Sequence, residues 1–162
     1  MRQIYLDLDG VMADFDRHFF DLFGMKSEGL DDTTLWRKIN GYGKFFSELP
    51  LCIGAMDFFE SIRPRNPIIL TACPKTNYQV AAMQKREWVQ TTLGTDIHVL
   101  PMLGGKNKAL FMHKKGDILI DDFEKNCVSW REHGGEAILH RDFETTVKQL
   151  ELIDDAVVMY RT

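Results

Sequence analysis

Short apolar runs alternate with amphipathic stretches along this chain, and the order of the two patterns predicts the fold. Apolar runs with the length of buried strands occupy residues 4–6, 67–71, 97–100, 117–120 and 137–139. Apolar residues recur at helical spacing in residues 11–23, 54–62, 75–93, 126–133 and 145–152. This rhythm of strand and helix is typical of a parallel sheet with helices on both faces. We therefore expect an α/β fold with three layers. Residues 157–159 fit either an edge strand or a packed tail.

One segment, residues 15–51, departs from this alternation. After a first helix, Asp31 offers a capping residue for a second short helix, which the glycines at 41 and 43 interrupt. The segment is too short for a separate domain and too aromatic for a plain linker. We therefore expect a small helical cap at 15–51, inserted after the first strand, and a core made of residues 1–14 and 52–162.

The amino-acid composition excludes some classes of protein and leaves the predicted fold unchanged. The 162 residues are 44% hydrophobic and 27% charged, enough for one sizeable core. A formal net charge of -4 argues against binding to a nucleic-acid polymer. No run approaches the length of a membrane span, and the chain runs into its first strand with no signal-peptide core. Cys52, Cys73 and Cys127 lack metal-ligand spacing, so we expect free thiols and a cytoplasmic protein.

Polar chemistry follows three of the predicted strands. Asp7 and Asp9 end the first, Thr71 ends the second, and Asp121 with Asp122 ends the fourth. In a parallel sheet these ends lie on one edge, where open α/β sheets place their ligands. Buried carboxylates are costly unless they are paired or bound to a metal, and Mg²⁺ prefers oxygen ligands. The pattern predicts metal-assisted phosphoryl transfer.

Basic residues are needed as well, because a transferring phosphoryl group is itself negatively charged. The candidates are Lys75, Lys85, Arg86, Lys106 and Lys108.

The motifs together resemble the haloacid dehalogenase superfamily of phosphotransferases. The resemblance covers most of the chain and rests on Asp-Leu-Asp-Gly-Val (7–11), a threonine ending a strand, a downstream lysine, and Ile-Leu-Ile-Asp-Asp (118–122). It implies a Rossmann-like core. It also implies that Asp7 is the nucleophile that takes the phosphoryl group and that Asp9 is the general acid, which later activates water. Thr71 would hold the phosphoryl oxygens.

The same resemblance implies the metal site. Asp121 and Asp122 would bind Mg²⁺ together with Asp7 and the backbone carbonyl of Asp9.

Two lysines compete for the catalytic position. Lys85 lies on the helix after Thr71, which resembles the arrangement in the 5'(3')-deoxyribonucleotidases. Most other superfamily members place the lysine just before the fourth strand, where this chain has Lys106 and Lys108. We predict Lys85 as the catalytic lysine and keep Lys108 as the alternative.

The deoxyribonucleotidase likeness extends to the substrate. It is carried by Asp9 to Phe15, by Phe-Phe-Ser-Glu-Leu-Pro (45–50), and by Thr-Ala-Cys-Pro-Lys (71–75). It implies substrate contacts from Phe15, Trp36, Phe45, Ala72 and Lys75. The cap is shorter than in that family, and alanine stands where the family has serine at position 72. Aromatic residues such as Phe15, Trp36 and Phe45 are more often part of core or cap packing than of a base-stacking surface, so both interpretations stay open.

The function expected from these observations is Mg²⁺-dependent hydrolysis of a small phosphomonoester through an aspartyl phosphate, with a deoxyribonucleoside monophosphate as the substrate. A sugar phosphate or another small phosphoester is the alternative substrate. A phospho-accepting receiver domain is disfavoured, because its acidic pair follows the first strand and here the order is reversed. The sequence leaves monomer and homodimer open.

Overall fold

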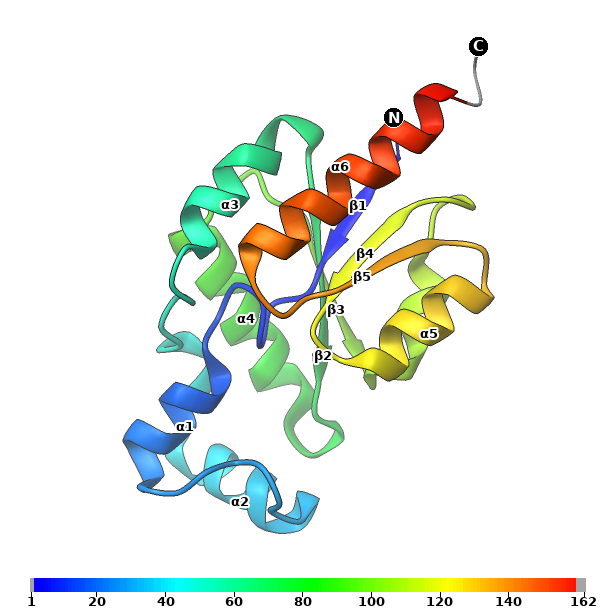
Figure 1. Ribbon diagram of the computed structural model, residues 1–162. Helices are drawn as coiled ribbons and strands as arrows, with labels where there is room; N and C mark the ends of the chain where they lie inside the picture. Colours follow the sequence, from blue (N-terminus) through cyan, green and yellow to red (C-terminus); the bar gives the residue numbers. More distant parts are fainter. Residues whose placement is uncertain (1, 160–162) are drawn as a thin grey trace.

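The computed structural model describes residues 2–159, and a five-stranded parallel sheet lies at its centre (Figure 1). Every strand pair is parallel, and the strand order is β3-β2-β1-β4-β5. The strands are β1 (Ile4–Leu6), β2 (Ile68–Cys73), β3 (Val99–Leu103), β4 (Ile118–Asp121) and β5 (Glu136–Leu139). The expected α/β fold with a parallel sheet is confirmed.

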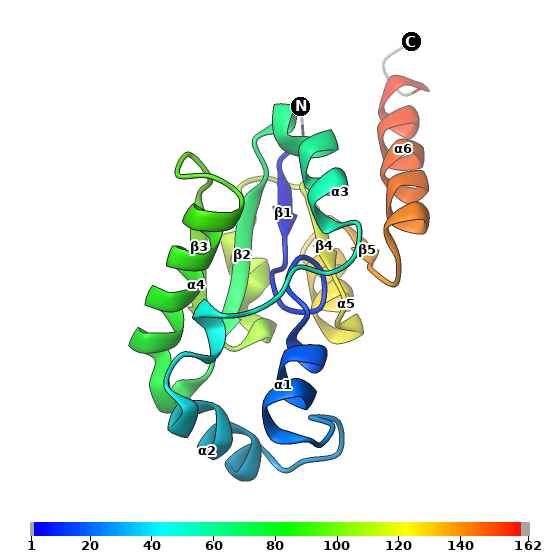
Figure 2. The same cartoon turned by 90° about the vertical axis from the view of Figure 1, so that its left-hand side faces the viewer.

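Helices cover both faces of the sheet (Figures 1 and 2). One face carries α3 (Ala55–Ile62), α4 (Tyr78–Thr92) and α6 (Phe143–Met159); the other carries α5 (Glu124–Glu132) and the 3-10 helix η4 (Gly105–Phe111).

The alternation of side chains along the strands divides the core between these faces. In β1, Ile4 and Leu6 join the larger apolar cluster with α3, α4 and α6, whereas Tyr5 points to the cluster with α5. Tyr5 packs there against Trp130 of α5 with ring centroids 5.1 Å apart. Each face is therefore closed by apolar packing, and the strand ends are left for chemistry.

Several element boundaries differ from the predicted ones. The last helix, α6, runs from Phe143 to Met159 and includes residues 157–159, so no edge strand forms there. The stretch from Lys75 to Leu93 divides into a 3-10 turn, η3 (Lys75–Asn77), and α4. The third strand begins at Val99 and continues to Leu103, because its parallel register with β2 extends as far as Cys73.

The helices of residues 15–51 lie beyond the carboxyl ends of the strands, at the lower end of Figures 1 and 2. They are α1 (Phe15–Phe23), α2 (Asp32–Tyr42) and the 3-10 helix η1 (Phe45–Ser47). Asp14 caps α1 by accepting from the Arg17 backbone N–H at 3.2 Å, and Asp31 caps α2 by accepting from that of Thr34 at 2.8 Å. We call residues 15–51 the cap; its division from the core as a domain stays a prediction.

Two chain segments join the cap to the core, and they are paired with each other. The Asp14 backbone N–H donates to the Pro50 carbonyl at 2.8 Å, and the Cys52 backbone N–H donates to the Met12 carbonyl at 2.8 Å. The connection is thus a short two-stranded neck.

Helix α4 also holds the returning part of the cap. Gln84 accepts from the Phe46 backbone N–H at 3.1 Å and donates to the Gly43 carbonyl at 2.7 Å. One turn further on, the Trp88 indole N–H donates to the Leu49 carbonyl at 2.7 Å. These three hydrogen bonds fasten residues 43–49 to α4.

Two further expectations concern the class of protein. Cys52, Cys73 and Cys127 are free thiols. Within residues 2–159, no helix is both long and apolar enough to cross a membrane.

Candidate active site

The carboxyl ends of the strands bring the predicted acidic residues together. Asp7 directly follows β1, Asp121 ends β4, and Asp122 follows it. Their carboxylate oxygens include a set that lies within 4.8 Å of one another. Neighbouring strands β1 and β4 pair in register through Leu6 and Ile120, so the residue after each strand reaches the same place.

Asp9 reaches the site from a tight turn. The backbone N–H groups of Met12 and Ala13 both donate to the Leu8 carbonyl at 2.9 Å, and Gly10 adopts a left-handed φ of 79°. A side chain at Gly10 would meet Asp122, because an ideal Cβ there would lie 2.1 Å from its Oδ2. The sequence therefore needs glycine at this position both for the turn and for the close approach of the acidic pair.

The carboxylates of the site repel one another electrostatically. Burial raises the pKa of Asp7 to about 8; Lys108 opposes this shift, and the charges of Asp121, Asp122 and Asp9 add to it. Burial and then Asp121 raise the pKa of Asp122 to about 6. Protein atoms alone thus leave the cluster short of positive charge at neutral pH.

Lys108 supplies part of that charge. Its side chain is 2% exposed, and its Nζ lies 2.8 Å from Asp7 Oδ1 and 2.5 Å from Asp121 Oδ2. Burial alone would lower the pKa of Lys108, but the two carboxylates raise it above its usual value. This lysine therefore stays charged beside the predicted nucleophile.

Lys85 occupies a different part of the same site. Its Nζ, on a side chain 1% exposed, donates to Asp9 Oδ2 at 2.7 Å, to Thr71 Oγ1 at 3.0 Å and to the Ala72 carbonyl at 2.6 Å. The structure thus brings both candidate lysines to the strand ends: Lys108 contacts Asp7, and Lys85 contacts Asp9 and Thr71.

The sequence did not single out Asn126, which also belongs to the site. Its Nδ2 lies 3.1 Å from Asp121 Oδ2, while the Phe123 backbone N–H donates to Asp121 Oδ1 at 2.8 Å. Together with Lys108, these donors hold the Asp121 carboxylate in one orientation. The only signal for Asn126 was its place five residues after Asp121, in the first turn of the following helix.

A cavity of about 560 Å³ opens beside Asp9, between the cap and the strand ends. Three of the predicted substrate-binding residues line it: Trp36 from α2, and Ala72 and Lys75 from the end of β2 and the turn after it. The other lining residues are Asp32, Cys73, Pro74, Thr76, Gly104 and Gly105. Of these, Asp32 is the charged residue that the sequence did not assign to substrate.

Phe15 and Phe45 do not line this cavity. Phe45 is 1% exposed, and its ring centroid lies 5.0 Å from that of Phe15 and 4.9 Å from that of His18. Phe15 is partly buried and stacks on Phe19 at 6.4 Å. The structure places both rings in the aromatic packing of the cap.

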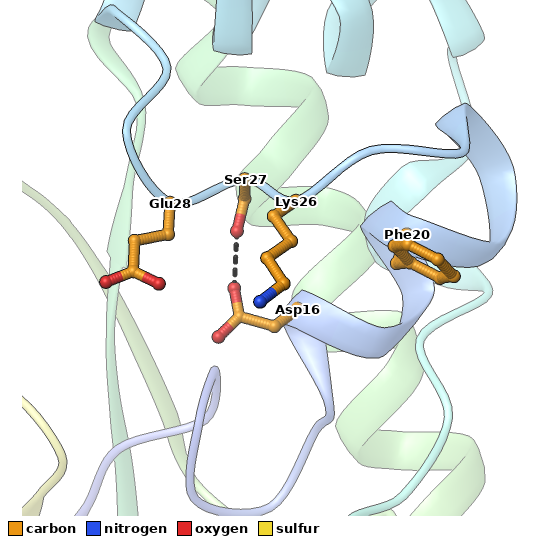
Figure 3. A pocket seen from close by; sticks show the side chains of 5 residues that line it. All are labelled: Asp16, Phe20, Lys26, Ser27 and Glu28. Atoms are coloured by element: carbon orange, nitrogen blue, oxygen red, sulfur yellow. Dashed lines mark hydrogen bonds between the residues drawn. The ribbon is translucent and has the colours of Figure 1, made fainter.

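Figure 3 shows a second pocket, of about 300 Å³, formed by α1 and the loop after it. Asp16 there accepts a 2.5 Å hydrogen bond from the Ser27 hydroxyl, with Phe20, Lys26 and Glu28 around them. None of the predicted site residues lines it, so the chemistry of the strand ends belongs to the larger cavity.

The acidic cluster fits a hard divalent cation. Asp7, Asp121 and Asp122 offer only oxygen ligands. Burial and neighbouring carboxylates raise the pKa of Asp7 and of Asp122, which indicates negative charge that the protein does not compensate. Mg²⁺ at this point would supply the missing charge.

Comparisons with known proteins agree at the level of the fold. No family model matches the chain, and no curated protein matches it by sequence. Among solved structures, a hydrolase from Streptococcus pneumoniae superposes with a TM-score of 0.56 at 14% identity, over 93% of this chain and 98% of that one.

Two further structures are similar. A HAD-superfamily hydrolase from Ehrlichia chaffeensis gives a TM-score of 0.53 at 11% identity, covering 94% of this chain and 98% of the other. A phosphonoacetaldehyde hydrolase-like protein from Oleispira antarctica gives 0.53 at 12% identity, covering 84% and 71%. At such low identity the likeness concerns the fold, and the chain has the Rossmann-like core seen in hydrolases of the haloacid dehalogenase superfamily.

Proposed function

We propose that this protein is a Mg²⁺-dependent phosphomonoesterase that works through a phosphorylated Asp7. One observation carries the proposal: Asp7 is clustered with Asp121 and Asp122 and contacts Lys108, and Asp9, two residues on, lines a cavity large enough for a small molecule. Nucleophile, cation site, acid and leaving-group space thus meet at one sheet edge.

In the first step, an Asp7 carboxylate oxygen attacks phosphorus and the bond from phosphorus to the ester oxygen breaks. Asp9 gives its proton to the departing oxygen, which leaves as an alcohol. In the second step, Asp9 takes a proton from water, the water oxygen attacks phosphorus, and the bond to Asp7 breaks to release phosphate. Splitting the reaction in this way replaces one difficult displacement with two easier ones.

The surrounding groups stabilise charge. Lys108 favours the ionised form of Asp7, as its 2.8 Å contact allows, and lies beside the carboxylate that would take the phosphoryl group. Thr71 offers its hydroxyl to a phosphoryl oxygen. Asp7, Asp121, Asp122 and the Asp9 carbonyl would hold Mg²⁺, which neutralises charge on the phosphoryl oxygens when bound.

A deoxyribonucleoside monophosphate is the substrate we propose. Trp36 and Lys75 line the cavity beside Asp9, and its volume of about 560 Å³ lies within the usual range for small-molecule sites. An aromatic side chain offers a stacking surface for a base, and Lys75 offers a donor to a base or sugar oxygen.

The test is a panel of phosphomonoesters assayed for phosphate release with and without Mg²⁺. We expect Mg²⁺-dependent turnover, fastest with deoxyribonucleoside monophosphates; faster turnover of sugar phosphates would show that the substrate assignment is wrong. Asp7→Asn should reduce kcat by at least about a thousandfold. The matched control, Asp57→Asn, alters an exposed aspartate of α3 and should leave the rate unchanged. Full turnover in Asp7→Asn would exclude the covalent mechanism.

A further inference from the structure

The two buried lysines differ in how many of their donors are already used. A lysine ammonium has three N–H donors and no acceptor. Lys85 directs all three at protein oxygens, those of Asp9, Thr71 and the Ala72 carbonyl. Lys108 meets two oxygens, on Asp7 and Asp121. A phosphoryl oxygen can therefore be met by Lys108, whereas Lys85 would have to give up an existing contact.

The contacts of Lys85 determine what its partners can do. Asp9 Oδ2 is held by the ammonium, while Asp9 Oδ1 is buried without a hydrogen-bond partner. Thr71 Oγ1 accepts from Lys85, so its own hydrogen is free to be donated elsewhere. One lysine thus holds the acid's carboxyl group in one orientation and leaves the threonine hydroxyl as a donor.

The cap closes the remaining side of Lys85. The ring of Phe46 lies with its centroid 4.7 Å from Nζ, within the range of a cation–π contact. Phe46 is itself held by the hydrogen bond from its backbone N–H to Gln84, the neighbour of Lys85 on α4. The ammonium is therefore enclosed on every side by groups that the fold keeps in place.

We propose that Lys85 is a positioning residue, which orients the Asp9 carboxyl toward the leaving-group oxygen and the Thr71 hydroxyl toward the phosphoryl group, without contacting the substrate. The inference rests on the proposed phosphatase function and assigns different roles to the two lysines. Lys108 acts on the nucleophile, and Lys85 acts through the acid.

Comparing substrates with different leaving groups distinguishes a positioning role of Lys85 from a merely structural one. Phenyl phosphate releases a poorer leaving group than p-nitrophenyl phosphate and depends more on proton donation by Asp9. General acid catalysis contributes about 10²- to 10⁴-fold, so misplacing the acid should slow phenyl phosphate more. We expect Lys85→Met to lower kcat/KM for phenyl phosphate at least about tenfold more than for p-nitrophenyl phosphate.

Asp9→Asn serves as the reference, because it removes the acid itself. It should show the same selective loss on phenyl phosphate, and the double variant should be little worse than Asp9→Asn alone, since both changes act through one carboxyl group. Lys108→Met should instead slow both esters by a similar factor.

The matched control is Lys148→Met, which makes the same change at a lysine of α6 whose side chain is 67% exposed, and it should change neither rate. A thermal melt of each variant confirms folding, since removing one partner of a buried ion pair destabilises a protein. If Lys85→Met does not fold, Lys85→Gln, which keeps amide donors, takes its place in the same comparison.

Two outcomes separate failure of this inference from failure of the proposed function. If the native protein needs Mg²⁺ and Asp7 for turnover but Lys85→Met slows both esters equally, the positioning role is wrong and the phosphatase stands. If the native protein hydrolyses neither ester nor any member of the phosphomonoester panel with Mg²⁺, both are overturned.

Discussion

Replacing Gly10 with alanine is expected to move Asp122 and weaken Mg²⁺ binding while leaving the fold intact. The new Cβ would lie 2.1 Å from Asp122 Oδ2, about 1.3 Å short of the 3.4 Å at which ordinary contact begins. A carboxylate at the end of a side chain can turn away at little cost. In doing so, it leaves the cluster with Asp7 and Asp121.

A second glycine allows the backbone strain of the substitution to be separated from the displacement of Asp122. Gly10 has φ 79° and Gly43 has φ 82°, but an alanine Cβ at Gly43 would meet nothing within 4 Å. Both substitutions force an L-residue into the left-handed region, which destabilises by roughly 1–2 kcal/mol. Gly43→Ala therefore measures the backbone strain alone.

The assay is urea denaturation of the native protein and both variants, with and without saturating Mg²⁺. Without the ion, both variants should lose about the same 1–2 kcal/mol. A ligand at a hundred times its Kd stabilises by about 2.7 kcal/mol, and Gly43→Ala should keep that gain while Gly10→Ala loses most of it. An equal Mg²⁺ gain in the two variants would refute the placement of Asp122 at the ion.

Two further predictions concern the free energy of unfolding: its dependence on a buried core residue and its dependence on pH. Ile120→Ala, at a fully buried position of β4, should lower the free energy of unfolding by about 2–5 kcal/mol in chemical denaturation, whereas Leu152→Ala, at a position 68% exposed, should change it by less than about 0.5 kcal/mol. Burial lowers the pKa of His140, whose Nδ1 lies 2.8 Å from Thr146 Oγ1. As the pH falls below about 6.5, His140 therefore gains its proton in the unfolded chain before it does so in the folded protein. Stability should therefore decline more steeply in the native protein than in His140→Gln as urea unfolding is followed from about pH 8 to pH 5; parallel declines would show that His140 does not contribute.

The fold could be predicted because each buried strand is recognisable in the sequence as a short apolar run. In β1, alternate residues enter opposite faces, and both faces are covered by helices, so Ile4 to Leu6 must be apolar throughout. The meeting of Asp7 with Asp121 and Asp122 follows from parallel pairing alone. The strands and the polar residues at their ends were therefore within reach of sequence reasoning, whereas the strand order comes from the structure.

The rest of the site depends on features that leave no periodic signal. Lys108 reaches Asp7 from a 3-10 helix after a pair of glycines, and such short turns show no pattern that fixes where a side chain points. The cap aromatics show the same difficulty. Trp36 faces the cavity and Phe45 faces its own neighbours, a difference that depends on packing and not on residue type.

The three hydrogen bonds that fasten residues 43–49 to α4 limit how the cavity can admit a molecule. Swinging the whole cap away would break the pair made by Gln84 and the one made by Trp88, at a net cost of roughly 0.5–1.5 kcal/mol each. At about 1 kcal/mol apiece, fewer than roughly one molecule in a hundred would be open at any moment. The cavity beside Asp9 therefore has a fixed rim where the cap meets α4, and we expect a substrate to enter and leave without a swing of the whole cap.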